Sequence, residues 1–231
     1  MKEEFSRSER LIGADALSCL RAARVAVFGV GGVGGYVVEA LARSGVGTLD
    51  LIDSDEVAPS NINRQIIALH STLGQKKVEV AKRRVLDINP TATVNVHAVF
   101  YLPETAHLFD FSQYDYVVDA IDTVAGKMEL VKRAKAAGVP IICSMGAGGK
   151  IDPCRFEVAD IYKTSVCPLA KVMRSLCRKN GIESLKVVYS REETKTLPST
   201  ERTPASMIFA PAAAGLAIAA EVVCDLASIT K

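Results

Sequence analysis

Short apolar runs and longer amphipathic segments alternate along the first part of the chain. The run Arg24–Phe28 is apolar, too short for a helix and followed by a glycine turn, so it predicts a buried strand. Apolar residues then recur at helical spacing up to Gly45, and Thr48–Ile52 is a second apolar run. A strand, a glycine turn, a helix and a strand within about 30 residues are typical of a βαβ unit.

The same alternation continues to residue 145. Because strands that alternate with helices form parallel sheets covered on both faces, it predicts a Rossmann-like, doubly wound and mostly parallel α/β sheet. The further predicted segments are helices at 8–23, 76–88 and 126–137 and strands at 94–99, 116–121 and 139–144.

The pattern changes after residue 146. Apolar and polar residues alternate over 151–158 as in an antiparallel strand, so a smaller antiparallel extension is expected in the C-terminal half. Residues 190–206 hold almost no apolar residues and predict a mobile loop. The other expected segments are a basic helix at 168–179, a strand at 185–189 and a last helix at 211–226 that packs on the sheet.

Composition and charge fit a soluble globular protein. Apolar residues make up 49% and charged residues 23% of the 231 positions, which excludes wholesale disorder. The net charge is only +2, from 28 basic and 26 acidic residues, whereas a general nucleic-acid coating protein is far more basic. Any contact with RNA or DNA must therefore come from a local patch.

The cysteines and the apolar runs point to the cytoplasm. The six cysteines form no C-x-x-C pair, so no structural zinc site is expected and free thiols are the default interpretation. The N-terminus lacks the apolar core of a secretory signal. The longest apolar run, Met207–Ala220, contains Pro211 and Gly215 and is too short to span a membrane, so it predicts a buried helix.

A glycine-rich loop follows the first strand and opens the first helix of the βαβ unit. Gly29, Gly31 and Gly34 form the pattern G-x-G-x-x-G, which lets backbone N–H groups approach phosphates at a helix N-terminus. Asp53 ends the second strand, where a carboxylate can accept hydrogen bonds from ribose hydroxyls. A tight turn without a ligand is the alternative. Taken alone, the pattern suits NAD at least as well as ATP.

Two cations after the ribose acid shift the balance toward ATP. Arg64 and Lys77 come shortly after Asp53 in the sequence. A triphosphate carries more charge than the bridging phosphates of a dinucleotide, and Arg and Lys supply the countercharge. The alternative is that both are solvated surface charges.

Asp122 stands at the C-terminal end of the predicted strand 116–121. Doubly wound sheets bind their ligands at that edge, and a carboxylate there can hold Mg²⁺ on phosphates. The alternative is an N-cap of the following helix.

These motifs occur together in one order: Gly29-x-Gly31-Gly32-x-Gly34, Asp53-x-Asp55, Asn61-x-x-Arg64-Gln65, Gly74-x-x-Lys77 and Asp119-x-x-Asp122. In this the chain resembles the ubiquitin-activating-enzyme-like superfamily, which includes ThiF and MoeB and adenylates carboxylates with ATP. The resemblance implies that the glycines, Asp53, Asp55, Asn61, Arg64, Gln65 and Lys77 form the ATP site. Asp53 would hold the ribose, Asn61, Arg64 and Lys77 the phosphates, and Asp122 the Mg²⁺.

The second half is similar to the tRNA threonylcarbamoyladenosine dehydratase branch of that superfamily. The segments that carry this likeness are Gly146–Pro153, Asp160–Thr164, Pro168–Ala170 and Pro211–Leu216. Gly35 and Cys167 depart from the usual pattern, which has a serine and an acid there. The resemblance implies a single adenylating domain over residues 1–231, with a nucleotide-binding half at about 8–145 and a substrate-side half at about 146–231.

The branch implies a reaction and partners. A threonylcarbamoyl carboxylate beside the tRNA anticodon would be adenylated, pyrophosphate released and the group closed into a ring as AMP departs. A homodimer is expected, with Arg10 as a candidate arm into the partner's site or else an exposed helix charge. Lys171, Arg174 and Arg178 share a helix face and are candidates for contacts with tRNA phosphates, as is the run Lys82–Arg84; a solvated basic face is the alternative for both.

Three other functions compete with this interpretation. An adenylating enzyme for a ubiquitin-like sulfur carrier, with a sulfur-transfer partner, shares the first half but usually has two zinc-binding C-x-x-C pairs. One of Cys154, Cys167 and Cys177 could then accept sulfur, whereas Cys143 and Cys224 lie in apolar segments that predict core positions. An NAD-dependent oxidoreductase leaves Arg64, Lys77 and Asp122 without roles. A nucleotide-binding scaffold without turnover is the non-enzymatic alternative.

Overall fold

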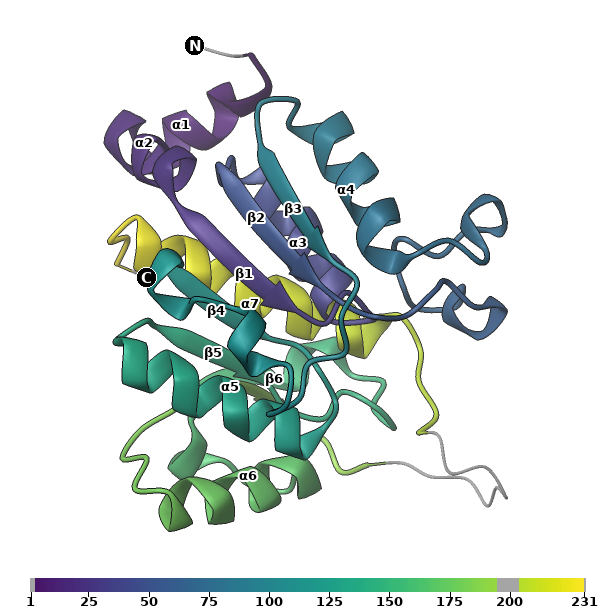
Figure 1. Ribbon diagram of the computed structural model, residues 1–231, viewed down its shortest axis with the longest axis vertical. Coiled ribbons are helices and arrows are strands. Elements are labelled where there is room, and N and C mark those ends of the chain that lie inside the picture. Colours follow the sequence, from purple (N-terminus) through teal and green to yellow (C-terminus); the bar gives the residue numbers. More distant parts are fainter. Residues whose placement is uncertain (1–2, 195–203, 231) are drawn as a thin grey trace.

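A seven-stranded sheet forms the centre of the protein (Figure 1). The computed structural model describes residues 3–194 and 204–230. The strand order is β3-β2-β1-β4-β5-β7-β6, and every neighbouring pair is parallel except β6 and β7. This confirms the mostly parallel sheet with an antiparallel extension. The strands are β1 Arg24–Phe28, β2 Thr48–Ile52, β3 Thr93–His97, β4 Tyr116–Asp119, β5 Ile141–Ser144, β6 Phe156–Asp160 and β7 Lys186–Ser190.

Helices cover both faces of the sheet, and the strand alternation divides the core accordingly. Val25 and Val27 of β1 belong to the cluster that contains α3, α4 and α7, whereas Ala26 and Phe28 belong to the cluster that contains α5 and α6. The long helices are α3 Gly34–Arg43, α4 Lys77–Ile88, α5 Val124–Ala137, α6 Pro168–Lys179 and α7 Phe209–Leu226. Short 3₁₀ turns lie at Glu3–Phe5, Pro59–Asn61, His70–Thr72, Ala106–Leu108, Phe111–Gln113, Pro153–Arg155 and Ile161–Lys163.

Most predicted elements begin and end within two residues of the bounds in the structure, but two differ more. The single helix expected at 8–23 is two helices, α1 Ser6–Ile12 and α2 Ala14–Ala22, because Gly13 between them has a φ of 88° that breaks the helix. The strand expected at 151–158 begins only at Phe156. The preceding turn Pro153–Arg155 is capped by the Asp152 side chain, which accepts a hydrogen bond from the Cys154 N–H at 2.9 Å. Most of the expected loop at 190–206 lies outside the described residues.

The apolar helix α7 packs on the sheet and on α3. A Cβ atom on Gly215 would lie 2.5 Å from the Val33 carbonyl oxygen, so the two helices touch through a glycine. With its full 18 residues, α7 is long and apolar enough to cross a membrane by length and composition, which the shorter run in the sequence did not suggest. Because Ala214, Ile218 and Val222 are fully buried in the core of this fold, we interpret α7 as a core helix.

The strand order places a topological switch point between β1 and β4. From β1 the chain winds outward to β2 and β3 on one side, and β4, β5 and β7 continue on the other side. Ligands of doubly wound sheets bind at the carboxyl ends of the strands at such a point. A site is therefore expected among the residues that follow β1, β2 and β4.

Candidate functional site

A cavity of about 380 Å³ opens at the carboxyl ends of β1, β2 and β4. Residues far apart in the sequence meet there, as the parallel sheet requires. Of the residues predicted for the ATP and metal site, only Gly34 does not line it. The others are Gly29, Gly31, Gly32, Asp53, Asp55, Asn61, Arg64, Gln65, Lys77 and Asp122.

The glycine loop is packed too closely for side chains at two of its positions. Gly29 has a φ of 90°, and a Cβ on it would lie 2.6 Å from the Ala120 carbonyl oxygen. A Cβ on Gly34 would lie 1.8 Å from the Gly29 oxygen, so Gly34 lets the loop fold onto the start of α3 rather than face the cavity. At Gly31 the nearest atom would be Gln65 Nε2 at 3.7 Å, which leaves this backbone open to a ligand.

Asp53 is held in place by the backbone on both sides of it. Its Oδ2 accepts a hydrogen bond from the Val30 N–H at 2.8 Å, and its Oδ1 accepts one from the Asp55 N–H at 2.9 Å. Each carboxylate oxygen keeps further acceptor capacity. The carboxylate is thus a fixed acceptor beside the glycine loop, as a ribose-binding acid needs to be.

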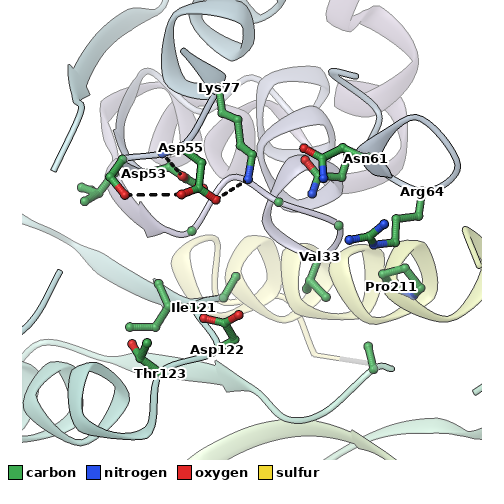
Figure 2. A pocket seen from close by; sticks show the side chains of 18 of the residues that line it. Val33, Asp53, Asp55, Asn61, Arg64, Lys77, Ile121, Asp122, Thr123 and Pro211 are labelled. Carbon is green, nitrogen blue, oxygen red and sulfur yellow. Dashed lines mark hydrogen bonds and ion pairs between the residues drawn. The ribbon is translucent and has the colours of Figure 1, made fainter. Parts of the chain in front are cut away.

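Lys77 enters the cavity as a nearly buried cation. Its Nζ donates to Asp55 Oδ2 at 2.7 Å, and its side chain is only 6% exposed, whereas that of Asp55 is 60% exposed (Figure 2). The Lys77 N–H also donates to the Asp55 carbonyl oxygen at 3.0 Å. The ammonium group is therefore positioned at the cavity by a carboxylate that faces solvent.

The turn after β2 presents an amide and a guanidinium to the cavity. Asn61 is buried, and its Oδ1 accepts the Ala58 N–H at 3.1 Å. Arg64 Nη1 donates to the Ser60 carbonyl oxygen at 2.6 Å and to Asn63 Oδ1 at 3.0 Å, which orients the guanidinium and leaves Nε and Nη2 for a ligand. The side chain of Gln65 is buried, and within the described parts of the chain its Oε1 has no hydrogen-bond partner.

Asp122 lies across the cavity from Lys77 and Arg64 (Figure 2). The N-cap of α5 is Thr123, so the alternative interpretation of Asp122 as the helix cap is wrong. Its side chain is exposed, and no hydrogen bond or ion pair joins it to another described residue. A carboxylate thus stands alone opposite two cations.

A fully buried ion pair supports the turn that carries Asp122. Lys127 Nζ lies 2.9 Å from Asp119 Oδ1, and both side chains are 0% exposed. The same oxygen accepts the Ile121 N–H at 3.3 Å, which ties the pair to the residue before Asp122. Burial, together with the Asp119 carboxylate, raises the pKa of the neighbouring Cys143 thiol. Sequence reasoning missed Lys127, although a lysine in the apolar stripe of a predicted helix is the signal of a buried partner.

Further cavity residues were not found from the sequence. Val99, Phe100 and Tyr101 follow β3 and line the cavity, with Phe100 half-exposed. The Tyr101 hydroxyl is buried without a hydrogen-bond partner among the described residues, and burial raises its pKa. Their position after a parallel strand was an available signal. Pro204 and Ser206 carried none, because only the tertiary fold brings them here.

The cysteines are separate from this cavity. Cys167, just before α6, and Cys177 on α6 are buried in the core on that face of the sheet, and burial raises the pKa of Cys177. Cys154 is exposed, and Cys224 is partly exposed rather than fully in the core as expected. Within residues 3–194 and 204–230, no three His, Cys, Asp or Glu side chains gather as a metal cluster would require.

Comparisons with known proteins match nearly the whole chain. The model of the ThiF family matches residues 5–227. A Bacillus subtilis protein named tRNA threonylcarbamoyladenosine dehydratase is 43% identical over 98% of this chain and 95% of its own. Crystal structures of the Escherichia coli tRNA N6-threonylcarbamoyladenosine dehydratase with AMP and with ATP superpose with a TM-score of 0.92 at 33% identity, covering 98% of this chain and 95% of that one.

A sulfurtransferase-type relative matches less well. The adenylyltransferase and sulfurtransferase UBA4 of Candida glabrata is 34% identical over 78% of this chain, but the match covers only 44% of that protein. The likeness therefore includes the shared adenylating part and leaves out more than half of the longer protein.

Two glycine substitutions should separate ligand binding from folding. Gly31→Ala has room for its Cβ and should leave the free energy of unfolding nearly unchanged, but it should raise the Kd for ATP by about 10-fold because the methyl group enters the cavity. Gly34→Ala should lower the free energy of unfolding by about 3 kcal/mol or more, because the Cβ meets a backbone oxygen. Calorimetric titration with ATP and urea denaturation measure the two effects. Equal stability of both variants would contradict the packing argument.

For the buried pair of Asp119 and Lys127, loss of one charge should destabilise the protein more than replacement of both charges. Asp119→Asn leaves Lys127 buried and unpaired, so it should lower the free energy of unfolding by about 3–5 kcal/mol. Asp87→Asn, at an exposed position on α4, is the matched control and should change it by less than about 0.5 kcal/mol. The double variant Asp119→Val/Lys127→Met should recover most of the loss in urea denaturation. A double variant as unstable as Asp119→Asn would show that the charges themselves are not the cause.

Proposed function

Because the chain belongs to the ThiF family, we propose that it is an ATP-dependent tRNA threonylcarbamoyladenosine dehydratase. It closes the threonylcarbamoyl group of the modified adenosine beside the anticodon into a ring and consumes ATP. The match to dehydratases extends over nearly the full length of both chains, which supports this activity over a function of the shared nucleotide-binding half alone.

One observation carries the proposal: a single cavity joins a phosphate-binding loop, a fixed ribose acid, two cations and an unpaired carboxylate. A dinucleotide would use the loop and Asp53 but would leave Arg64, Lys77 and Asp122 idle. A triphosphate uses all of them, because each added phosphate needs countercharge. Adenylation is thus favoured over hydride transfer.

The first step joins two anions. A carboxylate oxygen of the threonylcarbamoyl group attacks the α-phosphorus of ATP, and the bond from that phosphorus to the pyrophosphate oxygen breaks. Arg64 and Lys77 lower the repulsion between the reactants and stabilise the charge that moves onto pyrophosphate. The loop N–H groups and Asp53 hold the nucleotide, so the attack is largely a matter of position.

The second step needs no nucleophile from the protein. The carbamoyl group forms a bond to the activated carbonyl carbon, the bond from that carbon to the AMP oxygen breaks, and a proton leaves the carbamoyl N–H to solvent. The oxygen that leaves the substrate departs in AMP, and the net change of the nucleoside is the loss of one water. The buried thiols of Cys143 and Cys177, with their raised pKa values, fit a route without a thioester.

The residues present fit Mg²⁺ bound together with ATP. Mg²⁺ usually takes one or two carboxylates and completes its shell with phosphates and water. Asp122 is one such carboxylate and has no competing partner among the described residues. It would hold the ion against the phosphates, where the ion supplies further countercharge.

A homodimer is supported by the outer face of α7. Phe209 and Leu216 are about half-exposed on that face, at 50% and 51%, with Ala213 and Ala220 in line with them. Pro211, near one end of α7, lines the cavity, whereas the other end lies near α1 and α2 (Figure 1). If two copies pack α7 antiparallel, Arg10 on α1 of one copy approaches the cavity of the other. The cavity of the copy to which Arg10 belongs lies at the edge of the sheet that is far from α1.

We propose that the enzyme acts in the cytoplasm, since its substrate is a tRNA and all six cysteines are free thiols. The alternative is adenylation of a ubiquitin-like sulfur carrier with a sulfur-transfer partner. It uses the same nucleotide site, and a purified carrier that forms an acyl adenylate with this chain would favour it.

Nucleoside mass spectrometry tests the main proposal. The protein is incubated with ATP, Mg²⁺ and tRNA that carries the threonylcarbamoyl group, and the modified nucleoside should lose one water while AMP forms in equal amount. Arg64→Ala and Asp122→Ala should each lower turnover by about 100-fold, because each removes one charge contact with the reacting phosphates. Lys82→Ala, on the outer side of α4, is the control and should leave turnover unchanged.

The outcomes are distinct. An intact nucleoside without AMP would contradict the dehydratase and favour a scaffold. Near-normal turnover of both site variants would contradict the assigned roles while the activity stands.

The dimer is tested at the α7 face. Leu216→Glu should convert the dimer to a monomer, because a charge in an apolar contact cannot be solvated there. Light scattering after size exclusion gives the mass. Val172→Glu on α6 is the matched control for Leu216→Glu, since Val172 is 45% exposed on the other side of the sheet. This control should leave the mass unchanged. A monomeric wild-type protein, or dimers of both variants, would contradict the proposed interface.

A further inference from the structure

Several basic residues on α5 and α6 are exposed and have no acidic partner among the described residues. Other arginines and lysines of the fold are paired with acids: Arg24 with Asp50, Arg84 with Glu39, and Lys186 with Glu221 and Asp225. On α5 and α6, five exposed cations have no ion-pair partner among the described residues. They are Lys132, Lys135, Lys171, Arg178 and Lys179, called here the α5–α6 basic surface.

These cations lie on two neighbouring helices. The two helices pack against each other on the same face of the sheet (Figure 1). The Lys135 ammonium lowers the pKa of the Cys177 thiol on α6, against the larger raising effects of burial and Asp160. The Arg178 guanidinium lies 5.4 Å from the centre of the Tyr162 ring, which orients it and leaves its N–H groups exposed. α6 holds no acidic residue.

The structure changes the set of residues expected from the sequence. Arg174 shares the helix face with Lys171 and Arg178, but its Nη1 donates to the Thr164 carbonyl oxygen and hydroxyl, each at 2.7 Å. It holds the turn before α6 and is not a free cation. The two lysines of α5 replace it, and no sequence pattern linked them to α6.

The two helices that carry this surface begin at one wall of the cavity, and Lys132, Lys135, Arg178 and Lys179 lie in the second half of those helices. The nucleotide side is built from residues 29–77, whereas the opposite wall contains Asp122 and Thr123, which lead into α5. Ala147 and Gly148 continue that wall. A Cβ on the adjacent Gly146 would lie 3.6 Å from Cys167 Sγ at the start of α6. Both helices therefore run outward from the wall over which a second substrate must enter.

We propose that the α5–α6 basic surface docks the phosphate backbone of the RNA whose modified base enters the cavity. The inference rests on the proposed function, which supplies a polyanion as the second substrate. Unpaired lysines on an exposed surface bind phosphates by releasing counterions, without reading sequence. This fits an enzyme that recognises a chemical group on a base and needs the remainder of the RNA only to be held.

The competing surface on α4 is less suited. Arg84 is bound to Glu39 through two hydrogen bonds of 2.6 and 3.0 Å, and Arg83 is bonded to Gln75. α4 also lies on the other face of the sheet, beside the nucleotide side of the cavity. Its remaining charge at Lys82 makes it a matched control.

The test compares double variants with equal loss of charge. Lys132→Ala/Lys135→Ala and Lys171→Ala/Lys179→Ala should each raise the KM for threonylcarbamoyl-tRNA by about 10-fold at about 0.1 M salt. The slope of log affinity against log salt should fall by roughly one to two units in each, because up to two phosphate contacts are lost. The KM for ATP and the urea midpoint should stay at wild-type values. Lys82→Ala/Arg83→Ala should change none of these quantities.

Several results would overturn the assignment. Unchanged KM and salt slope in both surface variants would do so, as would a loss confined to the α4 control. If polyglutamate displaces the tRNA at equal charge concentration, the surface is a docking site for acidic proteins and not for RNA. Turnover by the wild-type protein separates the two proposals: active wild type with unaffected variants contradicts only the surface, whereas a wild type that converts no nucleoside contradicts the function.

Discussion

The site depends on the close approach of three chain segments at the end of β1. The Gly29 N–H donates to the Ile52 carbonyl oxygen and the Ala120 N–H donates to the Phe28 carbonyl oxygen, each at 2.8 Å, so the loop is bonded to both neighbouring strands. The Val30 N–H binds Asp53. Only glycine fits at position 29 between these partners. The same contacts that close the sheet at its switch point thus set the positions of the glycine loop and of Asp53.

The ion pairs on the two sides of the cavity differ in how deeply they are buried. On the nucleotide side, Lys77 is nearly buried and Asp55 is exposed, so solvent weakens the pair and a phosphate can compete for the ammonium. On the other side, the pair of Asp119 and Lys127 is fully buried and no ligand reaches it. The first pair is available for exchange, and the second is a rigid support that leaves Asp122 as the free carboxylate.

Much of the fold was predictable because its signals are local. Apolar runs bounded by glycine indicate β1 and β2, and the rule that parallel strands end at one edge of a sheet is enough to place Asp53 and Asp122 at a common cavity. The predictions that were wrong concern tertiary structure. The break at Gly13 and the engaged Arg174 depend on contacts or torsions that spacing does not encode. Cavity residues such as Ser206 come from a distant segment for the same reason.

The proposed chemistry needs little from the protein after adenylation. An acyl adenylate whose attacking group is already attached reacts within one molecule, so the site has to hold the substrate and exclude water rather than supply a nucleophile. Buried thiols with raised pKa values and free cations outside the cavity suit that division. A route through a thioester on the protein would instead need a reactive thiol near the adenylate. Within the described residues, the cavity wall contains no cysteine.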